Sequence, residues 1–160
     1  MLITAKVPMR VDLAGGTLDV YPLYLFEGGG LTVNAAINIR AYARVATRQD
    51  RRIIMRSEDL QFVEEIPCLE EMQFGGQLEL IKRALSYYRP QVGLEIIVRS
   101  EAPAGSGLGA SSALLMALSH CLNELTGRGL SHAEILDLGA NIEAQVIGIP
   151  TGKQDYFPPI

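Results

Sequence analysis

A predicted strand passes into a predicted helix through the segment Glu101–Ser112, which reads EAPAGSGLGASS. Its three glycines in five residues, Gly105, Gly107 and Gly109, let the backbone approach an anion closely. The start of the following helix adds free N–H groups and the positive end of the helix dipole. The hydroxyls of Ser106, Ser111 and Ser112 can bind phosphate or coordinate Mg²⁺. The segment therefore predicts a turn across which a polyphosphate could lie.

The simpler alternative is a flexible turn capped by serine, and a glycine-rich turn alone does not decide between the two. Two named phosphate-binding motifs fit less well. No Gly-Lys-Ser/Thr follows, so the segment is not a P-loop. Its G-x-G-x-G pattern is a poor dinucleotide-binding fingerprint, and the next predicted element is a second helix rather than a strand.

Outward from this segment, the chain divides into a strand-rich first half and a helix-rich second half. Apolar and alternating stretches predict strands at 2–7, 10–14, 32–36 and 39–47, a hairpin of 52–56 with 61–66, and a strand at 93–99. Helical spacing predicts helices at 77–88, 111–125 and 131–147, the last opened by a capping box of Ser131 and Glu134. This order predicts an α/β (α+β) fold in which a mixed sheet carries helices packed on one face.

Composition narrows the class of protein. With 160 residues, 48% hydrophobic and 20% charged, the chain fits one domain. A net charge of −4 argues against a nucleic-acid partner, and no apolar run approaches the ~20 residues of a membrane span. The first residues lack the regions of a signal peptide. Cys68 and Cys121 form no metal or redox motif, so we expect reduced thiols in a cytoplasmic protein.

Two acids near the end of the chain are candidate functional groups. Glu143 lies at the border of the apolar face of the helix 131–147, where an acid is unfavourable unless it is paired, solvated or bound to a metal. A boundary glutamate that reaches water is the simpler interpretation. Asp155 ends the loop 148–155, where a held carboxylate could take a proton from a hydroxyl or orient it. Arg10 is the cation that we expect to pair with Asp155 and keep it ionised.

The opening motif, Pro8–Asp19, reads PMRVDLAGGTLD and predicts a strand that runs into a glycine turn. Thr17 and Asp19 then stand on a loop. Aspartate is a good acceptor for paired sugar hydroxyls, as are backbone groups beside a glycine such as Gly16. The alternative is an aspartate that only serves a turn.

Taken together, these three segments resemble the GHMP kinase superfamily (galactokinase, homoserine kinase, mevalonate kinase and phosphomevalonate kinase). Residues 10–15 look like its first motif, and residues 103–113, PAGSGLGASSA, match its second, the phosphate-binding loop. Glu143, followed twelve positions later by Asp155, resembles its metal-ligand acid and catalytic aspartate. Residues 14–19, AGGTLD, are closest to kinases of heptose phosphate or fucose. Galactokinases usually carry Glu-His-Thr-Asp there, of which only Asp19 carries over.

The resemblance implies a ribosomal protein S5 domain 2-like fold and an ATP-dependent kinase that transfers the γ-phosphoryl group to a hydroxyl of a sugar or sugar phosphate. It implies Mg²⁺ ligands at Ser112 and Glu143, with Ser111 in place of Ser112 if the register shifts by one. Asp155 would be the base, Arg10 would stabilise charge, and Gly16, Thr17 and Asp19 would hold the sugar. The ATP phosphates would lie against Pro103, Gly105, Ser106, Gly107, Leu108, Gly109, Ala110, Ser111 and Ser112.

Members of the superfamily are typically longer and carry a C-terminal domain with a third, glycine-rich motif. We therefore expect residues 1–160 to be the N-terminal ATP-binding domain alone, with self-association through the surface that the second domain would cover. The expected partners are ATP and a small sugar, with neither nucleic acid nor membrane. Two other functions stay open: a truncated, non-catalytic nucleotide-binding or interaction domain, and a kinase for a non-sugar alcohol such as mevalonate or homoserine. Activity of this chain on its own also stays open.

Overall fold

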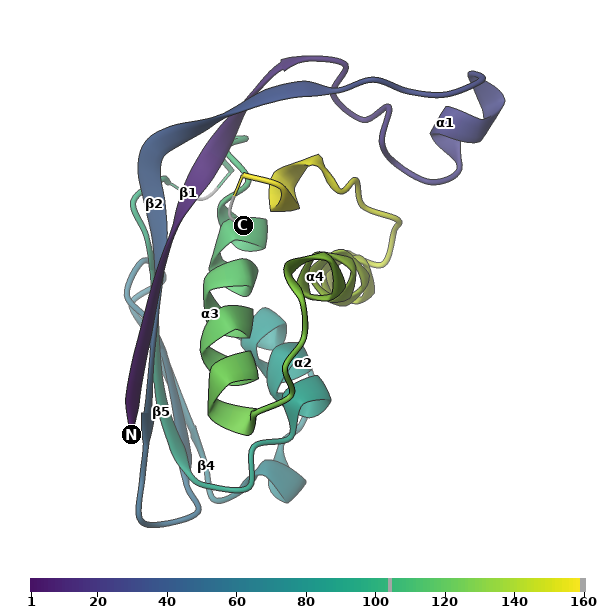
Figure 1. Ribbon diagram of the computed structural model, residues 1–160. Coiled ribbons are helices and arrows are strands. Elements are labelled where there is room, and N and C mark those ends of the chain that lie inside the picture. The colour runs from purple at the N-terminus through teal and green to yellow at the C-terminus, as the bar shows by residue number, and fades with distance from the viewer. Residues whose placement is uncertain (104, 159–160) are drawn as a thin grey trace.

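A computed structural model of the chain describes residues 1–103 and 105–158. One sheet of five strands, in the order β1-β2-β5-β3-β4, carries helices α2, α3 and α4 on a single face (Figure 1). All neighbouring strands are antiparallel except the parallel pair β3 and β5. The strands are β1 (Leu2–Ala14), β2 (Val33–Thr47), β3 (Ile53–Ser57), β4 (Phe62–Ile66) and β5 (Leu94–Ser100). The helices are α1 (Leu23–Phe26), α2 (Glu79–Tyr88), α3 (Ala110–Thr126) and α4 (His132–Ile147), with short 3₁₀ turns at η1 (Leu69–Glu71) and η2 (Gln154–Tyr156).

The predicted mixed sheet with helices on one face is confirmed, but four of the predicted strands are in fact two long ones. The stretches 2–7 and 10–14 are both part of β1, and 32–36 and 39–47 fall almost wholly within β2. The pairing of β1 with β2 shifts register between Pro8 and Met9. Because proline cannot donate a ladder hydrogen bond, it interrupts the regular pairing there without ending either strand. The sequence signal of a break was therefore real, and its interpretation as two separate strands was wrong.

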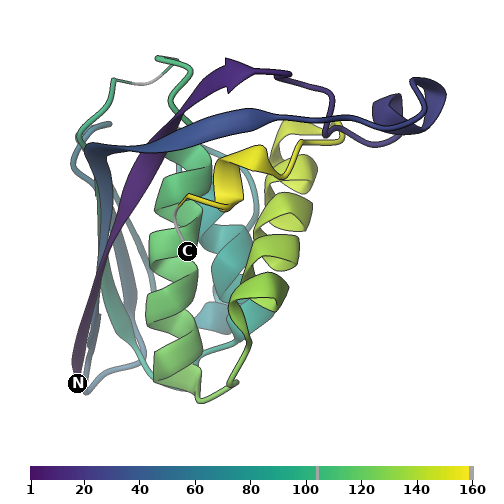
Figure 2. The same ribbon diagram turned by 45° about the horizontal axis from the view of Figure 1, so that its top comes forward.

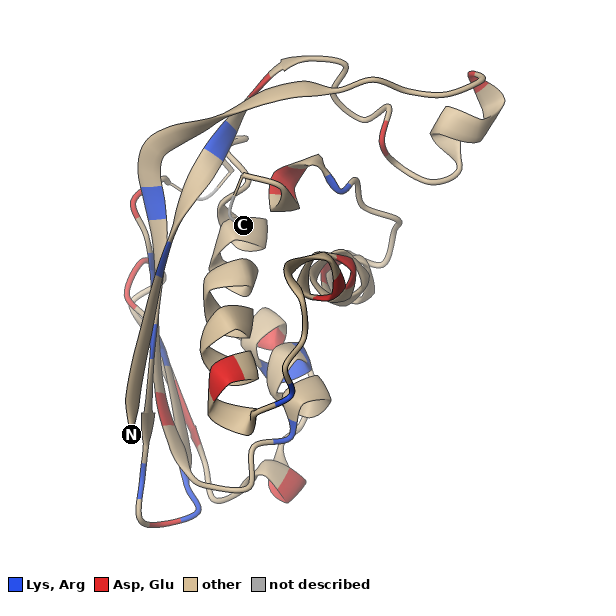
Figure 3. Ribbon diagram, viewed as in Figure 1, with Lys and Arg blue, Asp and Glu red and all other residues tan. Residues whose placement is uncertain are grey.

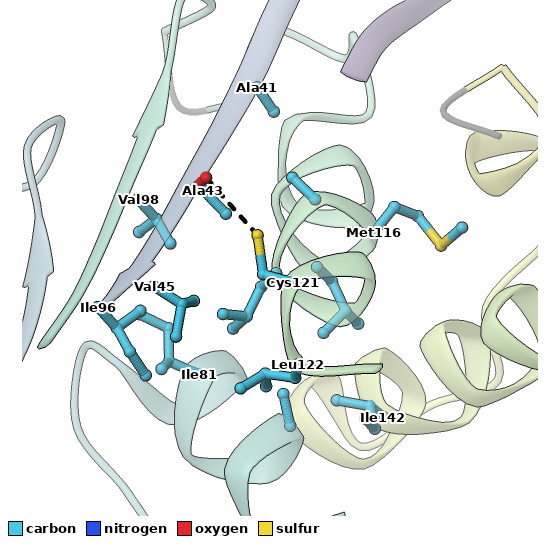
Figure 4. Packing of buried hydrophobic residues seen from close by; sticks show 14 of the residues in the cluster. Ala41, Ala43, Val45, Ile81, Ile96, Val98, Met116, Cys121, Leu122 and Ile142 are labelled. Atoms are coloured by element: carbon cyan, nitrogen blue, oxygen red, sulfur yellow. Dashed lines mark hydrogen bonds between the residues drawn. The ribbon is translucent and has the colours of Figure 1, made fainter. Parts of the chain in front are cut away.

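Helix α3 is the centre of the hydrophobic core. Its small residues let it lie close to the sheet: Cys121 is fully buried and points to the Ala43 carbonyl of β2, with its Sγ atom 3.7 Å from that oxygen (Figure 4). Larger side chains on other faces of the helix, such as Leu115, Met116 and Leu122, are also fully buried. This packing on β1 and β2 fixes the first turn of α3, and with it the glycine-rich loop, at one end of the sheet.

Helix α4 packs against α3 and has well-defined ends. The predicted capping box is present, because the Ser131 hydroxyl accepts from the Glu134 N–H while the Glu134 carboxylate accepts from the Ser131 N–H. Gly148 ends the helix in a left-handed conformation, with a φ of 74°. The chain then returns toward α3, so that η2 lies beside the upper part of that helix (Figure 2). None of the described helices combines the length and the apolar character needed to cross a membrane.

Replacing Ser131 by alanine should lower the free energy of unfolding by about 1 kcal/mol, because the Glu134 N–H in the first turn of α4 loses the hydroxyl that accepts from it. Urea denaturation followed by circular dichroism measures the change. Glu134→Gln is the matched control: glutamine can still accept from the Ser131 N–H, so its loss should be smaller. An unchanged midpoint for Ser131→Ala would contradict the capping role.

Candidate active site

The glycine-rich loop has the backbone conformation that its sequence predicts. Gly105, Gly107 and Gly109 have φ angles of 77°, 73° and 71°, all in the left-handed region. A Cβ atom added at Gly105 or Gly107 would meet nothing within 4 Å, so conformation rather than lack of room requires glycine at these two positions. Ala104 belongs to the predicted loop but lies outside the described residues. The loop is thus an open cradle directly before the first turn of α3.

A hollow of about 380 Å³, called here the loop hollow, lies against this cradle. Among the predicted phosphate-binding residues, those that line it are Gly105, Ser106, Gly107, Gly109, Ala110 and Ser111. The other three are placed differently: Pro103 and Leu108 do not line the hollow, and Ser112 is fully buried beneath it. Of the two adjacent serines, Ser111 is therefore the one that faces the hollow.

Arg10 ties the loop to Asp155. Its Nε donates to Asp155 Oδ1 at 2.8 Å, and another of its N–H groups donates to the Gly107 carbonyl. These residues come from β1, η2 and the loop, so the predicted pairing of Arg10 with Asp155 is present in the fold. Burial raises the pKa of Asp155 above its usual range, while the Arg10 guanidinium pulls that pKa down. A half-buried carboxylate with a raised pKa, held by a cation in a hollow, is typical of functional sites.

Glu143 of α4 is buried, with 8% of its surface exposed. The interpretation of it as a boundary glutamate that reaches water is therefore wrong. The Ser112 hydroxyl donates to its Oε2 at 2.8 Å, and the hydroxyls of Ser111 and Tyr156 also donate to this carboxylate. Its partners are all neutral, since no Lys or Arg among the described residues forms a salt bridge with it.

This cluster of oxygen atoms suits a magnesium ion that is held partly by phosphate. Mg²⁺ in proteins is usually bound by one or two carboxylates together with substrate phosphates and water. The described residues contain no group of three or more His, Cys, Asp or Glu side chains that could hold a metal by themselves. Glu143 with the adjacent serine hydroxyls fits an ion that is held by one carboxylate, substrate phosphates and water. A buried carboxylate without a cationic partner favours a positive ion beside it.

A second hollow, of about 460 Å³, lies on the other side of the Arg10–Asp155 pair. Asp19 and Thr17 line it. Asp19 Oδ2 accepts from the Gln154 N–H at 2.7 Å, while its Oδ1 has no hydrogen-bond partner among the described residues. Thr17 has a φ of 64°, which is unusual for a β-branched residue and marks a constrained turn.

Glycine is required around the second hollow by close contacts. A Cβ atom at Gly152 would lie 2.4 Å from Asp19 Oδ2, so only glycine lets the loop before Asp155 approach this carboxylate. Gly16, which was predicted to contact a substrate, is not among the residues that line the hollow. A Cβ there would lie 2.2 Å from a carboxylate oxygen of Asp12. The Gly16 carbonyl accepts from the Leu18 N–H at 2.8 Å, so Gly16 is part of the turn that carries Thr17 and Asp19.

Tyr156 is the site residue that sequence reasoning missed. Its ring is fully buried, and its hydroxyl donates to Glu143 and lies 3.2 Å from the Gly139 carbonyl oxygen. Burial, followed by the nearby Glu143 charge, raises the pKa of Tyr156. A signal was available in the sequence: Gly139 lies in the middle of a helix, where glycine is unfavourable unless another group packs closely. Tyr156 thus links Glu143 to the segment that carries Asp155.

The two hollows share Arg10 and Asp155. One hollow offers free backbone N–H groups and hydroxyls to an anion. The other offers the carboxylate of Asp19 to groups that donate hydrogen bonds. The arrangement can therefore hold an anionic compound and a hydroxyl-bearing compound on opposite sides of one carboxylate that is able to accept a proton.

Comparison with known proteins gives consistent matches. The family described as "GHMP kinases N terminal domain" matches residues 79–160. A D-glycero-alpha-D-manno-heptose 7-phosphate kinase from Campylobacter jejuni is 29% identical, over 97% of this chain and 47% of that protein. A mevalonate kinase from Pyrococcus horikoshii is 28% identical, over 94% of this chain and 47% of that protein. The chain thus spans about half the length of these curated relatives.

Solved structures agree with the sequence matches. The crystal structure of a D-glycero-D-manno-heptose 1-phosphate kinase from Bacteriodes thetaiotaomicron superposes with a TM-score of 0.87 and 31% identity. The match covers 98% of this chain and 52% of that one. The mixed sheet and its helices are therefore those of this group of kinases.

Replacing Gly139 by alanine should lower the free energy of unfolding by about 1–3 kcal/mol, as overpacking does. The new Cβ would lie 2.7 Å from Cε1 of the Tyr156 ring. Urea denaturation measures the effect.

The matched control is the same substitution in a Tyr156→Ala background. Without the ring, alanine should stabilise α4 by up to about 1 kcal/mol, since it is the better helix former. Equal destabilisation in both backgrounds would show that the Tyr156 ring is not what requires glycine.

Proposed function

Because the chain belongs to the GHMP kinases, we propose that it is the nucleotide-binding domain of a kinase that transfers the γ-phosphoryl group of ATP to a hydroxyl of a sugar or sugar phosphate. The observation that carries this proposal is the Arg10–Asp155 pair, which borders both the loop hollow and the second hollow. Phosphoryl transfer needs a phosphate donor and a hydroxyl acceptor on either side of one group that positions the hydroxyl.

The nucleotide would bind with its phosphates in the loop hollow. An apolar cavity of about 220 Å³ adjoins this hollow, and Leu60, Ser57, Ser111 and Leu114 line both. Its remaining walls are mostly aliphatic, including Ile81 and Val98. A flat, largely apolar nucleobase suits such a cavity, while the triphosphate would extend along the glycine-rich loop to the first turn of α3.

Magnesium would be held by Glu143 together with Ser111, the serine that faces the loop hollow, while the buried Ser112 would orient the Glu143 carboxylate through its hydrogen bond. When bound, magnesium would neutralise charge on the phosphates of the nucleotide. Arg10 would add a fixed positive charge beside the loop, where it already donates to the Gly107 carbonyl. Asp155 would accept the proton of the attacking hydroxyl or orient it. Positioning and charge neutralisation supply most of the catalysis in reactions of this type.

The acceptor would lie in the second hollow, with its hydroxyls on Asp19 and beside Thr17. Asp19 lines this hollow, and its carboxylate supports a polyhydroxylated acceptor, because a carboxylate accepts from hydroxyl groups. The same charge repels any acidic group placed beside it, so the carboxylate of mevalonate or homoserine, or the phosphate of a sugar phosphate, would have to lie away from Asp19. The similarity to a mevalonate kinase keeps that class as the second candidate.

The test of this function is ADP release from Mg-ATP with fucose, heptose 7-phosphate, galactose, mannose, mevalonate and homoserine as acceptors. Stimulation by a sugar or sugar phosphate is the expected result. Stimulation by mevalonate or homoserine alone would move the acceptor to the second class. Silence with every acceptor, together with retained ATP binding, would favour a non-catalytic nucleotide-binding domain.

In the same assay, Asp155→Asn should lower turnover by about 10²–10⁴-fold, since the proton acceptor is lost. Binding of Mg-ATP, measured by calorimetry, should stay close to that of the unsubstituted protein, because asparagine can still accept from Arg10. Normal turnover in this variant would remove Asp155 from the mechanism.

Replacing Gly107 by valine should weaken Mg-ATP binding by about tenfold or more, because a β-branched residue is strained in the left-handed region and its side chain would enter the loop hollow. The matched control is Gly129→Val. Gly129 has a φ of 66°, equally open surroundings and no contact with the hollow, so it carries the same backbone strain. Equal loss of binding in both variants would show that the loop hollow is not the nucleotide site.

A further inference from the structure

The outer face of the sheet, turned away from the helices, carries a group of cations without carboxylate partners. Figure 3 shows Lys and Arg positions recurring along the strands. Among the described residues, Lys6, Arg44, Arg56 and Arg99 form no salt bridge. All four are exposed. Since the whole chain has a net charge of −4, their grouping is a local feature and does not follow from composition.

Strand register brings these cations together. Tyr42 of β2 lies opposite Lys6 of β1 and Arg99 of β5. Two residues further along β2, Arg44 lies opposite Ile97 of β5. Ile97 in turn lies opposite Arg56 of β3. Side chains alternate between the two faces of a strand, and Ala43 and Val45 point to the core, so both rows are on the outer face.

A hollow of about 440 Å³ lies among these side chains, and we call it the outer-face hollow. Lys6, Arg44 and Arg99 line it together with Tyr42 and Glu58. Its volume falls within the range of small-molecule sites. It shares no lining residue with the loop hollow or the second hollow.

The Tyr42 ring holds two of the cations in place. Lys6 Nζ lies 5.1 Å from the ring centroid and Arg99 Cζ lies 5.3 Å from it. Such contacts of a cation with an aromatic ring are favourable. The Tyr42 hydroxyl in turn donates to Glu101 at 2.6 Å. The contacts with Lys6 and Arg99 and the hydrogen bond to Glu101 therefore hold the Tyr42 ring in place. The ring in turn restricts the positions of the two cations.

The repulsion among these cations calls for an explanation. Arg44 is a diagonal neighbour of both Lys6 and Arg99, and like charges this close repel one another. Positive residues often protect edge strands against unwanted pairing, but Arg44 and Arg99 are on the inner strands β2 and β5. A bound anion would relieve the repulsion.

Carboxylates limit the size of that anion. Glu58 and Glu101 border the row of Lys6, Tyr42 and Arg99 on one side, and Glu95 follows the row of Arg44 and Ile97 on the other. A long polyanion that crossed the face along the strands would meet these charges. A compact anion would fit between them, with Glu58 free to accept from hydroxyl groups.

We propose that the outer-face hollow binds a soluble phosphorylated small molecule, whose phosphate charges contact Lys6, Arg44 and Arg99 and whose hydroxyls donate to Glu58. This site is separate from the proposed catalytic one and does not rest on it. It would allow a phosphorylated metabolite to bind this chain without competing for the glycine-rich loop.

The test uses methyl NMR with inorganic tripolyphosphate as the probe. The Ile97 methyl groups report on the outer-face hollow, and those of Leu114 report on the loop hollow. Tripolyphosphate should shift the Ile97 signals saturably. Arg44→Ala/Arg99→Ala should weaken this binding by about tenfold or more, the order expected for two surface charge contacts. Arg51→Ala/Lys153→Ala, which removes two exposed cations elsewhere, should leave it unchanged.

Titration in the Gly107→Val variant separates this site from the catalytic proposal. The Ile97 shifts should persist there even if those of Leu114 are lost. Glu58→Gln should tighten the binding of tripolyphosphate more than that of glucose 1,6-bisphosphate, since the lost charge repels both anions but accepts more strongly than an amide oxygen from the hydroxyls of the sugar.

Three results would overturn the proposal. The first is the absence of a saturable Ile97 shift, and the second is equal weakening in the two double variants. The third is preference for another kind of anion: a single-stranded RNA oligomer, or vesicles of phosphatidylserine and phosphatidylcholine, that binds through Arg44 and Arg99 more tightly than tripolyphosphate does.

Discussion

The Arg10 guanidinium holds together parts of the chain that are far apart in sequence. It extends from the first strand, donates to the Gly107 carbonyl of the glycine-rich loop and pairs with Asp155 near the end of the chain. The guanidinium offers five donors in a rigid plane, so one side chain can serve two partners and fix the angle between them. Because Arg10 is itself buried, loss of one partner would leave a charge without compensation. The geometry of both hollows depends on this contact.

The second constraint is the packing of helix α4 on the C-terminal segment. Gly139 leaves room for the Tyr156 ring, and the Tyr156 hydroxyl reaches the Glu143 carboxylate. Because Gly139 has no side chain, the η2 turn can lie against α4 and place the Tyr156 hydroxyl beside the Glu143 carboxylate. Asp155 is the residue next to that ring, so its location follows from the packing of its neighbour.

Local patterns in the sequence predicted most of the fold. Helical spacing and the capping box at Ser131 predicted α4, and the glycine pattern predicted a left-handed loop before α3. The long strands were harder to predict, because Pro8 interrupts hydrogen bonding but not the strand itself. The burial of Glu143 was also missed, since it depends on Tyr156, which is remote from the apolar stripe of that helix. Pairing of Arg10 with Asp155 was expected only from chemistry, because no local pattern reports a contact between residues 145 positions apart.

The unequal lengths of the strands have a consequence for how the two sides of the site behave. β2 pairs with β5 only from Ala41 onward, so its first part, together with the end of β1, forms a two-stranded ribbon that carries α1 at its tip (Figure 1). A two-stranded ribbon is only marginally stable by itself, whereas the start of α3 rests on the full core. Thr17 and Asp19 lie in the turn that follows β1 at the end of this ribbon, and the glycine-rich loop leads directly into α3. The wall of the site at the end of the ribbon therefore rests on few elements, chiefly the hydrogen bond from the Gln154 N–H to Asp19, whereas the wall beside α3 rests on the whole core.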